Sequence, residues 1–201
     1  MQSNKLRLND AKTEVLVVVK PNQRKCVQDI TIRIGDSNIT PTKCVKNLVG
    51  YMDECMTMER QVRTVVRNTN YHIRRISKIR RFLDTDTYAK VISATVTSHL
   101  DYHNALLCGI HDKHLRSLQV VQNNAARLLS RSSRWEHITP ILKHLHWLPI
   151  RHRVTFKVLT LVHSALHRDI TPEYMRTLFT VYRPGRTLRS TSDEWKLTMP
   201  R

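Results

Sequence analysis

The sequence predicts an α+β fold that is mostly helical, with a small antiparallel sheet followed by a helical bundle and further helices. Short β-like segments separated by turn residues fill the first quarter of the chain. From Thr57 onward only Gly109 and Gly185 remain of the four glycines, and apolar residues recur at helical spacing. A chain of 201 residues, 40% of them hydrophobic, can bury a sizeable core.

Three segments are the predicted strands of the sheet: residues 13–19, 27–34 and 45–52. Residues 30–34 alternate apolar and polar side chains, as a half-buried strand does. The Gly-Asp-Ser-Asn run at 35–38 is typical of a turn. Turns this short between strands favour antiparallel pairing.

The first long helix, which begins near Thr57, has two contrasting sides. Thr57 is its predicted cap, and Glu59 supplies an acid to the first turn, where the helix dipole favours one. At ~100° per residue, its apolar residues fall within an arc of roughly 100° and predict a core face. They are Met58, Val62, Val65, Val66, Ile73, Ile76 and Ile79.

The other side of this helix carries a row of cations, which we call the basic stripe. It consists of Arg60, Arg63, Arg67, Arg74, Arg75, Lys78 and Arg81. These residues share an arc of about 120°. No acid occurs between Arg60 and Arg81, and only Arg80 falls on the apolar side. Because a face selected for solubility usually mixes signs, the stripe predicts contact with phosphates. An idle, solvated face is the alternative.

Further helices follow from the same spacing and from capping residues. One is predicted at 87–107, with Asp84 and Asp86 as capping acids rather than a catalytic pair. A second begins at the N-cap Asp112 and ends near Ser130. Short loops between them favour an antiparallel bundle. Three more helices are predicted. The first begins at Thr139-Pro140, the second ends near His167, and the third runs from Thr171-Pro172 to Phe179.

Four units are therefore expected along the chain. The sheet occupies 1–56, the helical bundle 57–135, the C-terminal helices 136–181, and a basic, loosely ordered tail 182–201. The longest strongly apolar run, 15–19, is too short to span a bilayer, and the first residues lack a signal-peptide core. The four cysteines form no CxxC pair. We therefore expect an intracellular protein with reduced thiols, without distinguishing nucleus from cytoplasm.

The composition favours a polyanionic partner. Lys and Arg number 34 against 16 Asp and Glu, which gives a formal net charge of +18. The excess is present in both halves of the chain, so a detachable basic tail does not explain it. A field of this sign and size attracts nucleic acids.

The residues needed for catalysis are not apparent. Phosphoryl transfer on nucleic acids usually needs carboxylates that hold two metal ions, and no two aspartates are adjacent in this chain. The chain also lacks the glycine-rich loops that cradle phosphates. The richest set of metal-ligand residue types is a weak zinc candidate whose spacing matches no familiar finger. It comprises His99, His103, Cys108, His111 and His114.

Short segments spread over nearly the whole chain form one ordered set of motifs. They are 6–14 (LRLNDAKTE), 45–48 (VKNL), 52–58 (MDECMTM), 99–107 (HLDYHNALL), 122–127 (QNNAAR), 137–140 (HITP), 145–149 (LHWLP), 182–184 (YRP) and 188–190 (LRS). This set resembles the reverse transcriptases of LINE-type, non-LTR retrotransposons. The resemblance covers the end of the palm, the thumb and the helices that follow it.

The resemblance implies that this chain is part of an RNA-directed DNA polymerase that uses Mg²⁺. It also implies that the fingers, the metal-binding aspartates and the endonuclease would lie upstream of Met1. Lys12 matches the family's motif lysine, which can approach the pyrophosphate leaving group, but it is orphaned without those aspartates. One departure is Leu48-Val49-Gly50 where the family usually has Leu-Gly-Val, which puts the tight turn in doubt.

The expected function is therefore that of a truncated reverse transcriptase, non-catalytic by itself and needing no cofactor of its own. It would bind RNA, DNA or their hybrid through backbone phosphates with little sequence preference. The partners it lacks would be the upstream polymerase domains. One alternative is a helical interaction module, or a translated retroelement relic, with no nucleic-acid role. Another is a zinc-stabilised binding module.

Overall fold

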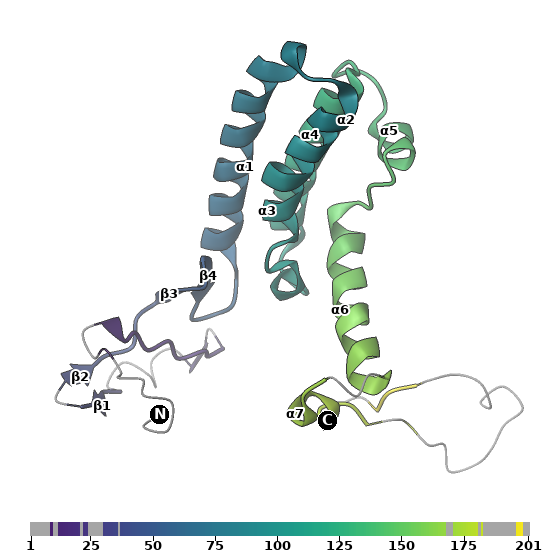
Figure 1. The fold of residues 1–201 in the computed structure, drawn as a ribbon. Coiled ribbons are helices and arrows are strands. Elements are labelled where there is room, and N and C mark those ends of the chain that lie inside the picture. Colours follow the sequence, from purple (N-terminus) through teal and green to yellow (C-terminus); the bar gives the residue numbers. More distant parts are fainter. Residues whose placement is uncertain are drawn as a thin grey trace, which may run out of the picture.

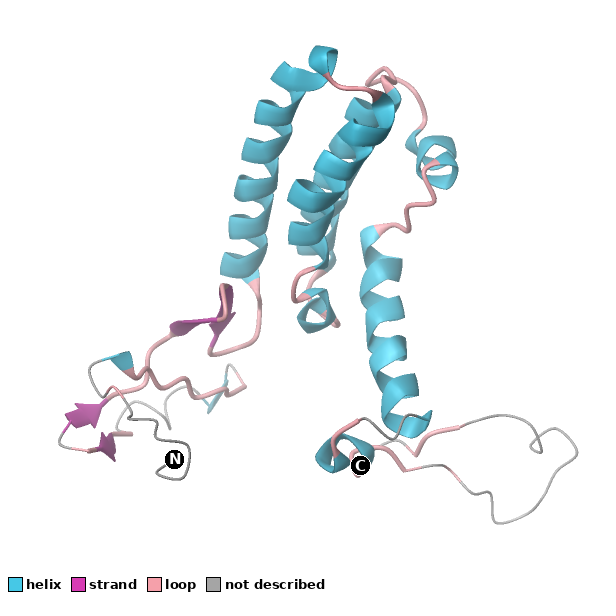
Figure 2. Ribbon diagram, viewed as in Figure 1, coloured by secondary structure: helices cyan, strands magenta, loops and turns pink. Residues whose placement is uncertain are grey.

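The computed structural model of the chain describes residues 9, 12–20, 22–23, 30–35, 37–167, 171–180, 182 and 196–198. Two β-hairpins lie at one end, and long helices stand beside one another next to them (Figure 1). Figure 2 shows how far helix outweighs strand. The predicted class, α+β and mostly helical with antiparallel strands, is confirmed.

The strands form two separate hairpins rather than the one sheet predicted. Strand β1 (Ile32–Ile34) pairs with β2 (Ser37–Ile39), and β3 (Cys44–Asn47) pairs with β4 (Gly50–Asp53), both antiparallel. The predicted strand at 13–19 was wrong, since that segment forms no strand: Val15 makes an isolated bridge to Pro41, and the Val19 N–H donates a 2.9 Å bond to the Glu54 carbonyl. Of the predicted strand at 27–34, residues 27–29 lie outside the described residues. The predicted turn at 35–38 is too long, because its last two residues belong to β2.

The segment 45–52, predicted as one strand, folds back on itself at Leu48 and Val49. Both residues have positive φ, 45° and 72°, which a two-residue hairpin turn of type I′ requires. Gly50 instead occupies the first position of β4, where an added Cβ would lie 2.4 Å from Nδ1 of His103. The tight turn thus forms without glycine, and the glycine permits a close approach of the His103 ring.

Helix α1 (Glu59–Ile79) is joined to β4 through Asp53. The Asp53 carboxylate accepts hydrogen bonds from the backbone N–H groups of Cys55 (3.2 Å), Thr57 (2.9 Å) and Met58 (2.8 Å), and from the Thr57 hydroxyl (3.0 Å). Thr57, the predicted cap, accepts only a 3.4 Å bond from Glu59. Burial alone would raise the pKa of Asp53, but the hydrogen bonds from Thr57, Met58 and Cys55 outweigh it and hold the pKa below the usual value.

Replacing Asp53 with alanine should lower the free energy of unfolding by about 1–2 kcal/mol, because the start of α1 loses its acceptor. The folded-state pKa is lowered, so this stabilisation is complete above the unfolded aspartate pKa of about 3.9. It is lost as the pH falls through the folded-state value. Urea denaturation at neutral pH and at successively lower pH measures the difference, with Asp53→Asn as a milder control. A difference that does not shrink in acid would contradict this account.

The next helical segment is a rod with a change of winding in its middle. Helix α2 (Thr85–Ile92) continues through a π-helical turn, η5 (Ser93–Thr97), into α3 (Ser98–Asp101). The carboxylate of Asp84 accepts a 2.9 Å bond from the Thr87 N–H, so the predicted capping role of Asp84 is confirmed. Asp86 is not the cap, because it lies in the first turn of α2 and pairs with Lys90. The predicted helix at 87–107 is interrupted at His103, which has φ 58°, and a 3₁₀ turn, η6 (Asn104–Leu107), follows.

Helix α4 (Asp112–Ser130) has the predicted bounds but a different cap. Nδ1 of His111 accepts a 3.2 Å bond from Lys113, while the carboxylate of Asp112 pairs with Arg151. Helices α5 (Ile138–His144), α6 (Ile150–His167) and α7 (Glu173–Arg176) follow, and α7 is shorter than predicted. The tail at 182–201 lies mostly outside the described residues.

The core lies where α1, the α2–α3 rod, α4 and α6 meet. Residues at a spacing of four, Tyr88, Ile92, Val96 and Leu100, are buried along the rod. The predicted face of α1 is buried or packed against the core except Ile79, which is 44% exposed because a 3₁₀ turn, η4 (Arg80–Phe82), follows it directly. None of the described helices combines the length and apolar character needed to cross a bilayer.

Candidate nucleic-acid interface

The basic stripe lies on the solvent side of α1, and all seven of its side chains are exposed. Arg60 and Lys78 are separated by 18 residues, which is roughly 27 Å along the helix axis. Arg63 pairs with Glu59 four residues earlier. In the part of the chain that the structure describes, no other member of the stripe forms an ion pair. The stripe is therefore an accessible cationic surface in which one charge, that of Arg63, is partly neutralised by an acid.

Aromatic rings accompany the stripe at both of its ends and in its middle. The guanidinium of Arg60 lies 4.3 Å from the ring centre of Tyr51, and that of Arg81 lies 4.6 Å from Phe82. Arg75 donates a 2.8 Å hydrogen bond to the Tyr71 hydroxyl. The rings hold these cations in place and offer apolar surface beside them. The role of these rings was not predicted, although Tyr71 stands four residues before Arg75 and so shares its face of the helix.

A second basic surface, which we call the tip groove, begins where the stripe ends. Helix α4 packs along α1, and the C-terminal ends of the two helices enclose an open groove of about 710 Å³. The groove is lined by Ile73, Ser77, Lys78, Arg80, Arg81, Asn124, Arg127, Leu128, Arg131, Ser132 and Arg134. Six of these side chains are Lys or Arg and none is acidic, so the groove strengthens the local positive field.

The tip groove brings together residues that are distant in the sequence. Lys78 and Arg81 belong to both the stripe and the groove, whereas Arg127, Arg131 and Arg134 come from the end of α4 and the loop after it. Sequence reasoning missed these three arginines because no local spacing links them to α1. Arg80, the exception on the helical wheel, lines the groove while its guanidinium lies 4.3 Å from the buried ring of Tyr88.

The predicted zinc candidates are not assembled into a site. His99 stacks on His72, with ring centres 5.3 Å apart, while His103 packs against Gly50 and His111 caps α4. Cys108 is exposed. Burial, together with the positive fields of His99 and Arg75, holds the pKa of His72 below its usual value. Among the described residues no three His, Cys, Asp or Glu side chains are close enough to share a metal ion, and His114 joins no such group.

The resemblance implies magnesium, which carboxylates would hold. In the described part of the chain no three His, Cys, Asp or Glu side chains gather at one point, so these residues do not form the carboxylate cluster that holds two metal ions in phosphoryl transfer. Lys12, which was matched to the family's motif lysine, is exposed in a turn before the hairpins, where its backbone N–H donates a 3.1 Å bond to the Asn9 carbonyl. We therefore derive no catalytic step through either group.

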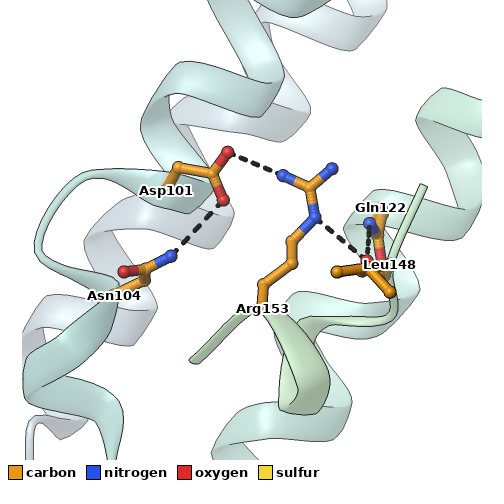
Figure 3. Close-up of polar contacts among 5 residues, drawn as sticks. All are labelled: Asp101, Asn104, Gln122, Leu148 and Arg153. Atoms are coloured by element: carbon orange, nitrogen blue, oxygen red, sulfur yellow. Dashed lines mark hydrogen bonds and ion pairs between the residues drawn. The ribbon is translucent and has the colours of Figure 1, made fainter. Parts of the chain in front are cut away.

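Three of the motif segments meet in one polar network that seats α6 on the bundle (Figure 3). The guanidinium of Arg153 contacts the Asp101 carboxylate at 2.6 Å and the Leu148 carbonyl at 2.9 Å. Gln122, which is buried, donates a 2.8 Å bond to the same carbonyl, and Asn104 contacts Asp101 at 3.5 Å. These motif residues therefore hold the helices together.

The arrangement as a whole can bind a polyanion along α1 and around the end of α4. Arginine donors suit phosphate oxygens because the guanidinium can donate two parallel hydrogen bonds. The rigid helices fix the spacing of these donors before any ligand arrives. Comparisons with family models, with curated proteins and with solved structures gave no match to this chain.

Proposed function

We propose that this chain binds the phosphate backbone of RNA, DNA or their hybrid, without catalysing a reaction by itself. The observation that carries the proposal is the basic stripe, seven exposed cations along α1 and the η4 turn that follows it. Within the described ranges, Arg63 is the one member of the stripe that pairs with an acid. Such a surface is costly to leave idle, because like charges four residues apart weaken a helix.

Binding of this kind depends on the release of counterions. Each Lys or Arg that neutralises a phosphate frees cations condensed on the nucleic acid, so affinity falls as salt rises. Contacts to phosphates position the strand and carry no sequence information. We therefore expect affinity that depends on salt and length more than on sequence.

The family resemblance gives this activity a context. We propose that the chain corresponds to the end of the palm, the thumb and the following helices of a LINE-type reverse transcriptase. Two observations support the proposal: the order of the motifs, and a hairpin that leads into a helical bundle whose basic side is open. The proposal includes an intracellular location and upstream polymerase domains as partners.

A salt series tests the binding proposal directly. If about six stripe cations contact phosphates on duplex DNA, a plot of log affinity against log salt should have a slope near −5. Affinity should then fall about a thousandfold between about 50 and about 200 mM salt. Filter binding with a labelled duplex of mixed sequence measures the slope. A slope near zero would refute backbone binding.

A helical interaction module without a nucleic-acid role is the second candidate. The observation that favours it is the outer side of α6, where Phe156 and Leu159 are 62% and 61% exposed. This candidate predicts only weak nucleic-acid binding, and predicts that neither salt nor changes in the stripe alter that binding specifically. The salt series therefore separates the two.

A further inference from the structure

We propose that the tip groove and Trp135 form a binding site for single-stranded nucleic acid. Phosphates would lie in the groove, and an unpaired base would stack on the indole of Trp135. The inference rests on the proposed backbone binding and extends it to a second surface with a defined strand preference. The cations of the stripe and of the groove would not give that preference without Trp135, because cations contact the phosphates of single and double strands alike.

The charge on the groove identifies a polyanion as its ligand. Six Lys or Arg side chains line it, from α1, η4, the end of α4 and the following loop, and none of its lining residues is acidic. Gathering like charges around a concave surface is electrostatically costly unless an anion offsets the repulsion. Several phosphates in a row would offset it better than one small anion, because the lining cations come from four separate segments.

Trp135 provides the feature that a phosphate site alone does not need. Its side chain is 82% exposed, although tryptophan has much to gain from burial. The guanidinium of Arg134, a lining residue of the groove, lies 4.6 Å from the indole ring centre. The ring therefore stands at the margin of the groove, and a base could stack on its open face.

The loop that carries Trp135 is held in shape by hydrogen bonds. The backbone N–H of Ser133 donates to the Glu136 carboxylate at 2.7 Å, and the backbone N–H of Trp135 donates to the Ser133 hydroxyl at 3.3 Å. Arg127 ties the loop back to α4 through a 3.1 Å bond to the Glu136 carbonyl. The exposed position of the ring is thus built into the loop, which lowers the entropy lost on stacking.

The shared residues give the strand a path between the two surfaces. Lys78 and Arg81 end the stripe and also line the groove. A strand that follows the stripe towards the end of α1 therefore passes into the groove without leaving the cationic surface. Bases paired within a duplex are stacked on their neighbours, whereas a single strand offers a free base face to the indole.

The test compares two probes with four proteins. The probes are a fluorescein-labelled oligothymidylate of about 20 nucleotides, which exceeds the usual site size of one single-strand-binding fold, and a blunt duplex of the same length. The proteins are the wild type, Trp135→Ala, Trp135→Phe, and a double charge-reversal variant with Arg63→Glu and Arg67→Glu. Fluorescence anisotropy gives the affinities, and circular dichroism checks that each protein is folded.

We expect Trp135→Ala to weaken oligothymidylate binding by about 5- to 150-fold, the contribution of one stacked base, and to leave duplex binding within about twofold. Trp135→Phe should retain most of the single-strand affinity because it keeps an aromatic face. The double charge-reversal variant should weaken binding of both probes.

Other outcomes overturn one proposal or both. Unchanged oligothymidylate affinity in Trp135→Ala would refute the stacking site while leaving backbone binding intact. Failure of the wild type to bind either probe would refute both. A competition experiment with polyglutamate gives the remaining outcome. If polyglutamate displaced the labelled oligothymidylate with the same efficiency as unlabelled oligothymidylate, the groove would select negative charge alone, as for an acidic protein partner. That result would also refute the stacking site.

Discussion

Reversing four charges of the basic stripe is expected to reduce duplex affinity by about a thousandfold or more. The variant carries Arg63→Glu, Arg67→Glu, Arg74→Glu and Lys78→Glu, and all four side chains are exposed. Losing four phosphate contacts should flatten the salt dependence by about 3.6 in slope, since each contact contributes about 0.9. The same salt series that tests the wild type measures both effects. An unchanged affinity would eliminate the stripe as the binding surface.

A matched control separates position from net charge. Lys113, Arg116, Lys143 and Lys157 are exposed on α4, α5 and α6, outside the stripe. Changing all four to glutamate lowers the formal net charge from +18 by eight, to +10, as the stripe variant does. The control should keep most of the affinity. Equal losses in the two variants would instead mean that binding follows overall charge.

The stripe variant should remain folded. Its side chains face solvent, and the one ion pair that it removes, Arg63 with Glu59, is an exposed pair of the kind that contributes little. Each new i,i+4 repulsion on α1 costs about 0.2–0.5 kcal/mol, which is small beside the stability of a domain. Loss of helical circular dichroism would show that this expectation is wrong.

Replacing Tyr88 with alanine is expected to lower the free energy of unfolding by about 3–5 kcal/mol. Tyr88 is fully buried at the junction of α1, α2 and α4, and the Arg80 guanidinium lies 4.3 Å from its ring. The substitution leaves a large cavity and removes that cation–π contact. Thermal denaturation followed by circular dichroism should show a drop of roughly 6–20 °C in Tm.

Tyr88→Phe is the matched control for this prediction. The Tyr88 hydroxyl is buried without a hydrogen-bond partner, so removing it relieves an unsatisfied polar group. Phenylalanine keeps the ring, and the variant should be as stable as the wild type or more stable by about 1 kcal/mol. A loss similar to that of Tyr88→Ala would show that the hydroxyl, rather than the ring, stabilises the core. Burial raises the pKa of Tyr88, although Arg80 opposes the shift, so the phenol is neutral near pH 7.

Local periodicity explains what could be predicted about α1. The stripe and the core face both follow from the positions of residues around one helix, and the structure places them on opposite sides. Ile79 was predicted on the core face but is exposed, because the helix gives way to a 3₁₀ turn one residue later. Periodicity identifies a face but not the residue at which the helix stops.

The tip groove and the capping residues could not be predicted in the same way. Arg131 and Arg134 line the same groove as Lys78 only because α4 packs along α1, a contact between segments about 50 residues apart. Asp53 caps α1 across a turn rather than from the N-cap position, which Met58 occupies. The hairpin at Leu48 and Val49 has no turn signal, since the residues usual in a type I′ turn are asparagine and glycine.

The π-helical turn at Ser93–Thr97 corrects the phase of the rod. Residues repeated every four positions drift by about 40° per step around an α-helix, so Tyr88, Ile92, Val96 and Leu100 would spiral away from the core. The wider π turn takes up this drift and keeps the four on one line. The phase of the rod also determines on which side Asp101 lies, and Asp101 forms the ion pair with Arg153 of α6. The winding of the π turn is thereby coupled, through this ion pair, to the position of α6 on the bundle.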